Sequence, residues 1–193
     1  TDGPVARKTP GQENTYAAAL VDGTTSMECL NASCGTALNL TGDVTFGAWL
    51  RPDASTLTTA SQDRYIMSKQ GTNAGYLMGI ATGNGSTTDY FYCMFGTGAG
   101  YGTANSATDA AVADTYRHYV CRRSGTTAQA FLNGAVSGAP ATSSALTTTT
   151  NAFRVGHYTT NTVAGLVDEA WIAGSALTIA DICRVATCGI RGE

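Results

Sequence analysis

Two adjacent carboxylates, Asp168 and Glu169, stand inside the otherwise apolar stretch 165–172. Glycoside hydrolysis needs two carboxyl groups across one bond, about 5 Å apart when configuration is retained and farther apart when it is inverted. Neighbouring residues of a strand, however, point to opposite faces of its sheet. We therefore expect this pair to lie in a late, mostly buried strand and not to act together in catalysis.

The histidines offer no better catalytic centre. His118 and His157 both fall in predicted strands, and no Gly-x-Ser-x-Gly elbow accompanies them. A histidine in such a place is usually hydrogen-bonded within or beside the core, because buried polar groups normally have partners. We expect the chain not to be an enzyme.

Composition excludes two classes of partner. Only 13% of the 193 residues are charged, the net charge is −3, and Arg122-Arg123 is the one basic cluster. Surfaces that bind the phosphate backbone of nucleic acids need dense positive charge, so nucleic acid is not expected as a partner. No apolar run reaches the roughly 18 residues that span a bilayer, so no membrane span is expected. The start at Thr1 fits a processed secreted protein or a trimmed chain, and we expect an extracellular, secreted or surface-displayed location.

Six cysteines are spaced in a way that suggests disulfides, and hence an oxidising compartment: Cys29, Cys34, Cys93, Cys121, Cys183 and Cys188. Reduced, buried thiols are the alternative. A zinc site is a third reading, but the C-x4-C spacing matches structural zinc poorly.

Geometry limits how the cysteines pair. Cys29 and Cys34 flank a turn-like stretch, and Cys93 and Cys121 fall in two predicted strands, where they would form a long-range link. Cys183 and Cys188 begin in a helix, where their Cα atoms would be roughly 8 to 9 Å apart. Because that exceeds disulfide reach, this pair requires the helix to break between them.

Short β-rich segments separated by turn residues fill most of the chain. The predicted strands are 16–21, 26–30, 44–52, 64–68, 75–81, 89–95, 116–123, 128–136, 153–158 and 165–172. The stretch 96–114 is predicted as a long loop, Asn133-Gly134 as a hairpin turn, and Thr178 with Asp181 as the capping box of a short final helix. The fold class predicted is all-β, a two-sheet antiparallel jelly-roll sandwich with one short C-terminal helical turn.

Seven sequence pieces occur in the order found in a known family. They are Asp22-Gly23, VTFGAWLRP (44–52), Ser68-Lys69 with Gly75-Tyr76, YRHYV (116–120), FLNG (131–134), Val155-Gly156, and GLVDE (165–169) ahead of Ala176-Leu177-Thr178. The chain resembles the laminin G-like or concanavalin A-like lectin-glucanase jelly roll from about residue 16 to residue 182. The resemblance implies one jelly-roll domain at 16–193. The polar stretch before it contains Gly3, Pro4 and Pro10 and predicts an extended N-terminal arm at 1–15.

The resemblance also bears on the acidic residues. Glycosidases of this fold carry their carboxylates as Glu-x-Asp-x-x-Glu along one strand, and none of the four glutamates begins that pattern. Several relatives hold a structural Ca²⁺ between the first and last strands, which implies Asp22 and Asp168 as oxygen ligands here. Alternatively, Asp168 caps a turn or pairs with an arginine such as Arg154, and Glu169 bonds across strands.

Sugar rings stack on aromatic side chains, and amides take their hydroxyl groups. The loop residues predicted to bind a ligand in this way are Tyr101, Tyr158, Asn105 and Asn161, with Tyr76 and Asn84 as further candidates. Our first hypothesis is a secreted, non-catalytic adhesion or recognition module that binds carbohydrate or a cell-surface or matrix glycoconjugate. The alternative is a structural subunit of an extracellular appendage, shell or virion that self-associates through its N-terminal arm.

Overall fold

The computed structural model describes most of the chain between residues 27 and 188. The described ranges are 7–8, 17–20, 27–58, 62–82, 89–108, 110–156 and 161–188. The arm predicted at 1–15 is therefore described only at Arg7–Lys8, which form strand β1 and pair with β2 of the same chain. The predicted residues Asp22, Asn84, His157 and Tyr158 lie outside the described ranges.

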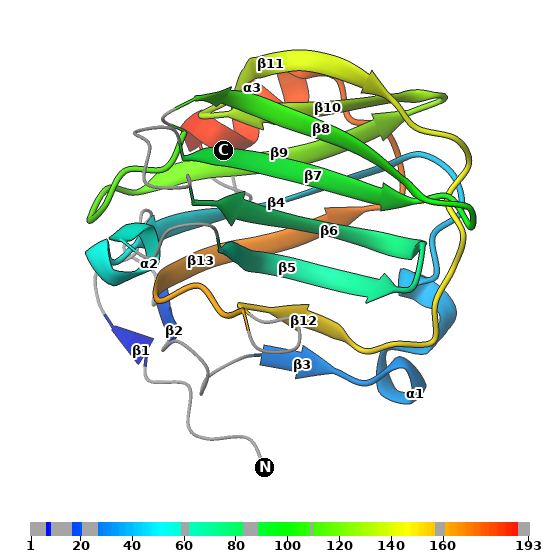
Figure 1. Ribbon diagram of the computed structural model, residues 1–193, viewed down its shortest axis with the longest axis horizontal. Coiled ribbons are helices and arrows are strands. Elements are labelled where there is room, and N and C mark those ends of the chain that lie inside the picture. Colours follow the sequence, from blue (N-terminus) through cyan, green and yellow to red (C-terminus); the bar gives the residue numbers. More distant parts are fainter. Residues whose placement is uncertain are drawn as a thin grey trace.

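Two antiparallel sheets face each other (Figure 1). The seven-stranded sheet has the order β1-β2-β13-β4-β9-β10-β11, with bounds Arg7–Lys8, Ala17–Leu20, Gly165–Ala173, Val44–Pro52, Arg117–Ser124, Thr127–Leu132 and Ala135–Thr142. The six-stranded sheet has the order β3-β12-β5-β6-β7-β8, with bounds Met27–Cys29, Phe153–Val155, Asp63–Gly71, Ala74–Ala81, Tyr90–Gly96 and Tyr101–Thr108. The predicted β-sandwich is confirmed.

The core fills the space between the sheets. Alternate residues of each strand point into it, as in β4, where Phe46 and Leu50 are fully buried, and in β7, where Phe91 and Phe95 are. Phe46 and Phe95 come from different sheets and meet edge to face with ring centroids 6.0 Å apart. The other residues of the same strands therefore point outward, and they form the outer faces on which a site can be built.

The cysteines give a mixed result. Cys93 of β7 pairs with Cys121 of β9 and so links the two sheets through the core, as predicted. Cys29 pairs with Cys34, also as predicted, and closes the chain around helix α1 (Asn31–Cys34). The predicted Cys183–Cys188 pair is wrong, because helix α3 (Ile179–Cys188) runs through both positions without a break and Cys183 is exposed and free.

The end of the chain folds as its sequence predicts. Asp181 N–H donates to Thr178 Oγ1 (3.1 Å) and Thr178 N–H donates to Asp181 Oδ2 (3.4 Å), which is the reciprocal capping box at the start of α3. α3 lies on the outer face of the seven-stranded sheet, where Ile182 packs with Val120 and Phe131. None of the described helices is long and apolar enough to cross a bilayer.

The stretch 96–114 differs from the prediction. It contains strand β8, which pairs with β7 and forms the edge of the six-stranded sheet, so it is not one long loop. Alternation in β8 is carried by Gly102, Ala104 and Ser106 on the inner face, and these small residues give no hydrophobic signal. The short elements η1 (Gly35–Leu38) and α2 (Ala54–Thr58) were also not predicted.

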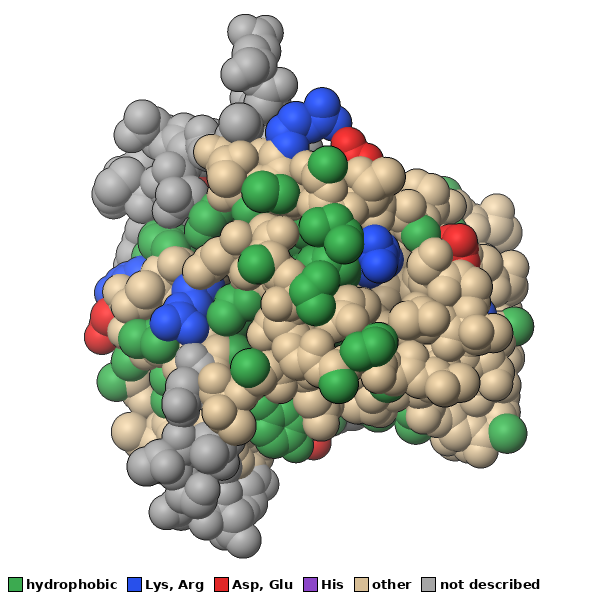
Figure 2. Space-filling model, turned by 90° about the horizontal axis from the view of Figure 1, so that it is seen from above, with side chains coloured by type: hydrophobic (Ala, Val, Ile, Leu, Met, Phe, Trp, Pro, Cys, Tyr) green, Lys and Arg blue, Asp and Glu red, His purple; other side chains and the backbone are tan. Residues whose placement is uncertain are grey.

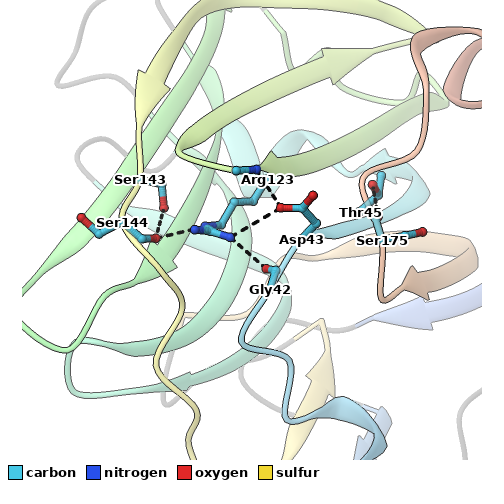
Figure 3. Close-up of polar contacts among 8 residues, drawn as sticks. Gly42, Asp43, Thr45, Arg123, Ser143, Ser144 and Ser175 are labelled. Carbon is cyan, nitrogen blue, oxygen red and sulfur yellow. Dashed lines mark hydrogen bonds and ion pairs between the residues drawn. The ribbon is translucent and has the colours of Figure 1, made fainter.

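A buried arginine ties one end of the sandwich together (Figure 3). Arg123 Nη1 donates to the Gly42 carbonyl (2.9 Å), Nε donates to the Ser144 carbonyl (3.0 Å), and Asp43 Oδ1 lies 3.8 Å from Nη1. These contacts join the residues before β4 to the segment after β11. The charge of Arg123 therefore has a structural use and is not available to a ligand.

Candidate functional site

A patch of aromatic and apolar side chains covers the outer face of the six-stranded sheet. It is separate from the core, and we call it the tyrosine face: Tyr65, Leu77, Ala81, Tyr90, Tyr92 and Met94. The register places Tyr65 and Tyr92 on either side of Gly79, and Ala81 beside Tyr90. Tyr65, Tyr90 and Met94 are partly exposed, so their side chains remain open to a ligand.

The tyrosines are held in fixed positions. Tyr92 is only 4% exposed, and its ring meets that of Tyr90 edge to face with centroids 6.4 Å apart. Gly79 allows this, because a Cβ at that position would lie 2.8 Å from the Tyr92 hydroxyl oxygen. The backbone N–H of Tyr65 donates to the Asn161 carbonyl (3.1 Å), which fixes the strand on the other side. A rigid aromatic surface of this kind suits a ring that stacks on it.

Polar side chains border the tyrosine face. Asp63 lies opposite Ala81, Thr103 opposite Met94 and Asn105 opposite Tyr92, and all three are exposed. Burial raises the pKa of Tyr92 far above its usual range, and the nearby Asp63 carboxylate raises it further. The Tyr92 hydroxyl thus stays protonated beside Asp63. The border offers carboxylate, amide and hydroxyl groups to the hydroxyls of a bound molecule.

The predicted ligand-binding residues are partly brought together here. Asn105 borders the tyrosine face, and Asn161 is attached to it through its backbone. Tyr101 is on strand β8 and not on a loop, and its hydroxyl group donates to the Gly71 carbonyl (2.9 Å) while accepting from Asn73 N–H (2.8 Å). Tyr101 therefore anchors the turn between β5 and β6. Tyr76 is buried, and its hydroxyl donates to the Leu38 carbonyl (3.1 Å).

The acidic pair lies in an irregular part of β13. Asp168 is opposite Trp49 but Trp171 is opposite Gly47, so one extra residue is inserted between them, and Glu169 has φ of +45°. The regular alternation assumed from the sequence therefore fails at this position. Asp168 Oδ1 accepts a hydrogen bond from Glu169 N–H (2.9 Å), which agrees with the turn-capping alternative. Arg154 pairs instead with Glu28 (2.8 Å).

The described residues do not by themselves form a calcium site. Asp168 is 7% exposed, and no group of three or more His, Cys, Asp or Glu side chains within the described ranges is placed to hold a metal. In the ladder of β13 with β2, Val167 lies opposite Ala18 and Gly165 opposite Leu20, and the other predicted ligand, Asp22, lies outside the described residues. The calcium site at Asp22 and Asp168 stays a prediction.

A second aromatic cluster lies on the outer face of the seven-stranded sheet. His118 is fully buried between Trp49 and Trp171, with ring centroids 5.1 and 6.2 Å away. Neither ring nitrogen of His118 has a hydrogen-bond partner among the described residues, and burial lowers its pKa to about 4. His118 is thus a neutral packing residue: its buried position agrees with the prediction, but the hydrogen bond expected of it is not found among the described residues.

Sequence reasoning missed the tyrosine face. In the sequence, Tyr90, Tyr92 and Met94 alternate with Phe91 and Cys93. Because both sets are apolar or aromatic, the pattern predicts a strand that is covered on both faces and does not single out one of them as a site. The signal that could have found the site is the chemical difference between the two faces: the outer one carries tyrosines and methionine, whose polar or polarisable groups suit partial exposure.

Comparisons with known proteins place this geometry in a family. A search of curated proteins finds no match. Domain 4 of the GH43 extracellular arabinanase AbnA from Geobacillus stearothermophilus, solved with arabinotriose, has a TM-score of 0.67 at 16% identity, covering 96% of this chain and 82% of that one. The CBM40 of the Ruminococcus gnavus IT-sialidase, bound to α2,3-sialyllactose, has a TM-score of 0.62 at 12% identity, covering 95% and 100%.

A native heptameric SAP-like pentraxin from Limulus polyphemus is also similar, with a TM-score of 0.60 at 14% identity over 80% of this chain and 74% of that one. At these identities the structures show a shared fold. The sequence model of a laminin G-like family, described as "Concanavalin A-like lectin/glucanases superfamily", matches residues 22–183. This range is most of the chain. Sequence and fold agree, and the chain belongs to the concanavalin A-like lectin/glucanase superfamily.

Proposed function

We propose that this domain is a non-catalytic carbohydrate-binding module of an extracellular protein and that it binds a glycan on the tyrosine face. The observation that carries the proposal is the set of fixed, partly exposed aromatic rings with a polar border on one sheet face. Sugars have apolar ring faces and polar edges, so stacking on Tyr65 and Tyr90 with hydrogen bonds to Asp63 and Asn105 satisfies both parts.

Two further observations support the proposal. The structurally similar arabinanase domain and CBM40 were solved with bound oligosaccharides. The sequence lacks the Glu-x-Asp-x-x-Glu arrangement of the superfamily's glycosidases. The extracellular location is supported by the two disulfides, which persist in oxidising compartments.

The test is a glycan array followed by calorimetry on any ligand found. Tyr65→Ala and Tyr90→Ala remove a stacking ring and should each weaken binding about tenfold, which corresponds to roughly 1.4 kcal/mol. Tyr65→Phe and Tyr90→Phe keep the ring and serve as matched controls, expected within about threefold of the unchanged protein because the stacking surface is retained. Unaltered binding by both alanine variants would remove the tyrosine face as the site.

Calcium binding at Asp22 and Asp168 is a separate proposal of ours, supported by the superfamily resemblance. Melting in Ca²⁺ and in EDTA tests it, since a ligand that binds only the folded state raises the melting temperature. The Asp168→Asn variant should lose that difference. Equal melting temperatures in the two solutions would end the proposal.

No structural observation favours the alternative of a self-assembling subunit. The described part of the N-terminal arm, Arg7–Lys8, pairs with β2 of its own chain. Light scattering of the protein with and without residues 1–14 tests the alternative, because assembly through the arm requires a mass above that of the monomer which falls to the monomer on deletion.

A further inference from the structure

The charges near the tyrosine face are unusually one-sided. Asp63 is exposed at its border, and Tyr92 lies close enough to Asp63 for the carboxylate to influence its hydroxyl. A bound sugar that stacks on Tyr65, two residues along β5 from Asp63, would therefore lie beside a negative charge.

The cations closest to this face in the sheet are already engaged. Arg64 adjoins Asp63 in sequence, but it is opposite Ile80 of the core, is 5% exposed, and donates to the Thr162 carbonyl (3.3 Å). Arg154 on β12 points to the same side as the tyrosine face but forms an ion pair with Glu28.

The other described cations with a placed side chain are bound elsewhere. Their acceptors are Asp114 for Arg51, Asn31 and Asn151 for Lys69, Ala110 for Arg117, Leu177 for Arg122, Gly42 and Ser144 for Arg123, and Asp181 for Arg184. The segments 59–61, 83–88 and 157–160, which adjoin the strands of this face in sequence, contain no lysine or arginine.

The rest of the surface is also poor in charge. Figure 2 shows one face of the molecule, which consists mostly of uncharged groups. The net charge of the chain is −3, so no net positive charge compensates for Asp63 at long range. A glycan that carries a carboxylate, as sialic and uronic acids do, would lose hydration at this face without gaining a bidentate arginine contact, which is among the strongest partners of a carboxylate.

We infer that the tyrosine face selects uncharged glycan chains and rejects glycans with a carboxylate, and that Asp63 is the residue that determines this selectivity. The inference rests on the proposed function and narrows its ligand class. Rejection by a repulsive charge is an ordinary means of specificity.

The experiment uses pairs of glycans in which one member carries carboxylates and the other does not. The probes are fully methyl-esterified and de-esterified homogalacturonan, and lactose and α2,3-sialyllactose, with arabinotriose as a further neutral glycan. Affinities of the unchanged protein are measured by calorimetry or by gel retardation. We expect binding to neutral probes, and at least tenfold weaker binding to the charged member of any pair that binds.

Two variants assign the selectivity to its residue. Asp63→Asn should reduce the ratio of neutral to charged affinity at least threefold, whereas Asp114→Asn removes the same charge near Arg51, away from the tyrosine face, and should leave the ratio unchanged. Raising the salt concentration should also reduce the ratio in the unchanged protein, because Asp63 is exposed and its repulsion is screened.

The outcomes are separable. Equal or tighter binding of the charged probes overturns the inference while the proposed function stands. A neutral preference that Asp63→Asn does not alter overturns the role of Asp63. If no glycan on the array and none of these probes binds, the proposed function fails and the inference fails with it.

Discussion

Lowering the pH should destabilise this domain through His118. In the folded protein His118 is fully buried between two indole rings, and its pKa is lowered to about 4 from the ordinary value of 6.5. In the unfolded chain the same imidazole takes up a proton near its ordinary pKa. Below pH 6.5 the unfolded state therefore binds more protons than the folded state, and stability falls as the pH falls toward 4.

The size of the effect follows from the shift. Each pKa unit corresponds to about 1.4 kcal/mol, so a shift from 6.5 to about 4 removes about 3 kcal/mol of unfolding free energy between pH 6.5 and pH 4. For a domain of this size that is a substantial share of a typical total stability of 5–15 kcal/mol.

Urea unfolding at a series of pH values from 7.5 to 4 measures the effect. Other groups also titrate in this range, so the informative quantity is the difference between the unchanged protein and His118→Phe, which keeps an aromatic ring between Trp49 and Trp171 but cannot take up a proton. The variant should lose about 3 kcal/mol less over this range. A His157→Phe variant shows how much belongs to the other histidine. Parallel curves for the unchanged protein and His118→Phe would refute the reasoning.

Three further changes test the packing that supports the site. Replacing Cys93 and Cys121 by alanine should lower the unfolding free energy by about 3–4 kcal/mol from loop entropy, measured by urea unfolding; no change would mean that the link is not formed. Arg123→Ala removes a buried guanidinium together with its hydrogen bonds to two partly buried carbonyl groups and should cost about 3 kcal/mol, whereas Arg123→Lys should cost less because its ammonium can still donate to one of them; no loss in Arg123→Ala would contradict the hydrogen-bond account. Gly47→Ala brings a Cβ within 3.0 Å of Trp171 and should lower stability by about 2 kcal/mol and alter the near-ultraviolet circular dichroism; an unaltered spectrum would show that the ring is not packed there.

The sequence by itself determined the fold class, one hairpin turn and the start of the C-terminal helix. Short runs of β-branched, aromatic and apolar residues bounded by turn residues, such as 44–52 and 89–95, predict strands from local sequence alone, so β4 and β7 could be predicted. The Asn133-Gly134 turn has positive φ at both residues, and the Thr178–Asp181 capping box is a local hydrogen-bond pattern, so neither needs information from distant residues.

Only the tertiary structure decided where the candidate site is. The two faces of β7 look equally apolar in the sequence. Which face packs into the core depends on the pairing of β7 with β6 and β8 and on contact with the opposite sheet. The bulge at Glu169 also depends on tertiary pairing, because β4 offers one residue fewer than β13 between Asp168 and Trp171. Asp168, which the sequence suggests as a functional residue, instead accepts a hydrogen bond from the backbone of β13 at this bulge. Tyr65 lies far from Tyr90 and Tyr92 in the sequence, but the fold makes the three residues neighbours on the outer face of the six-stranded sheet.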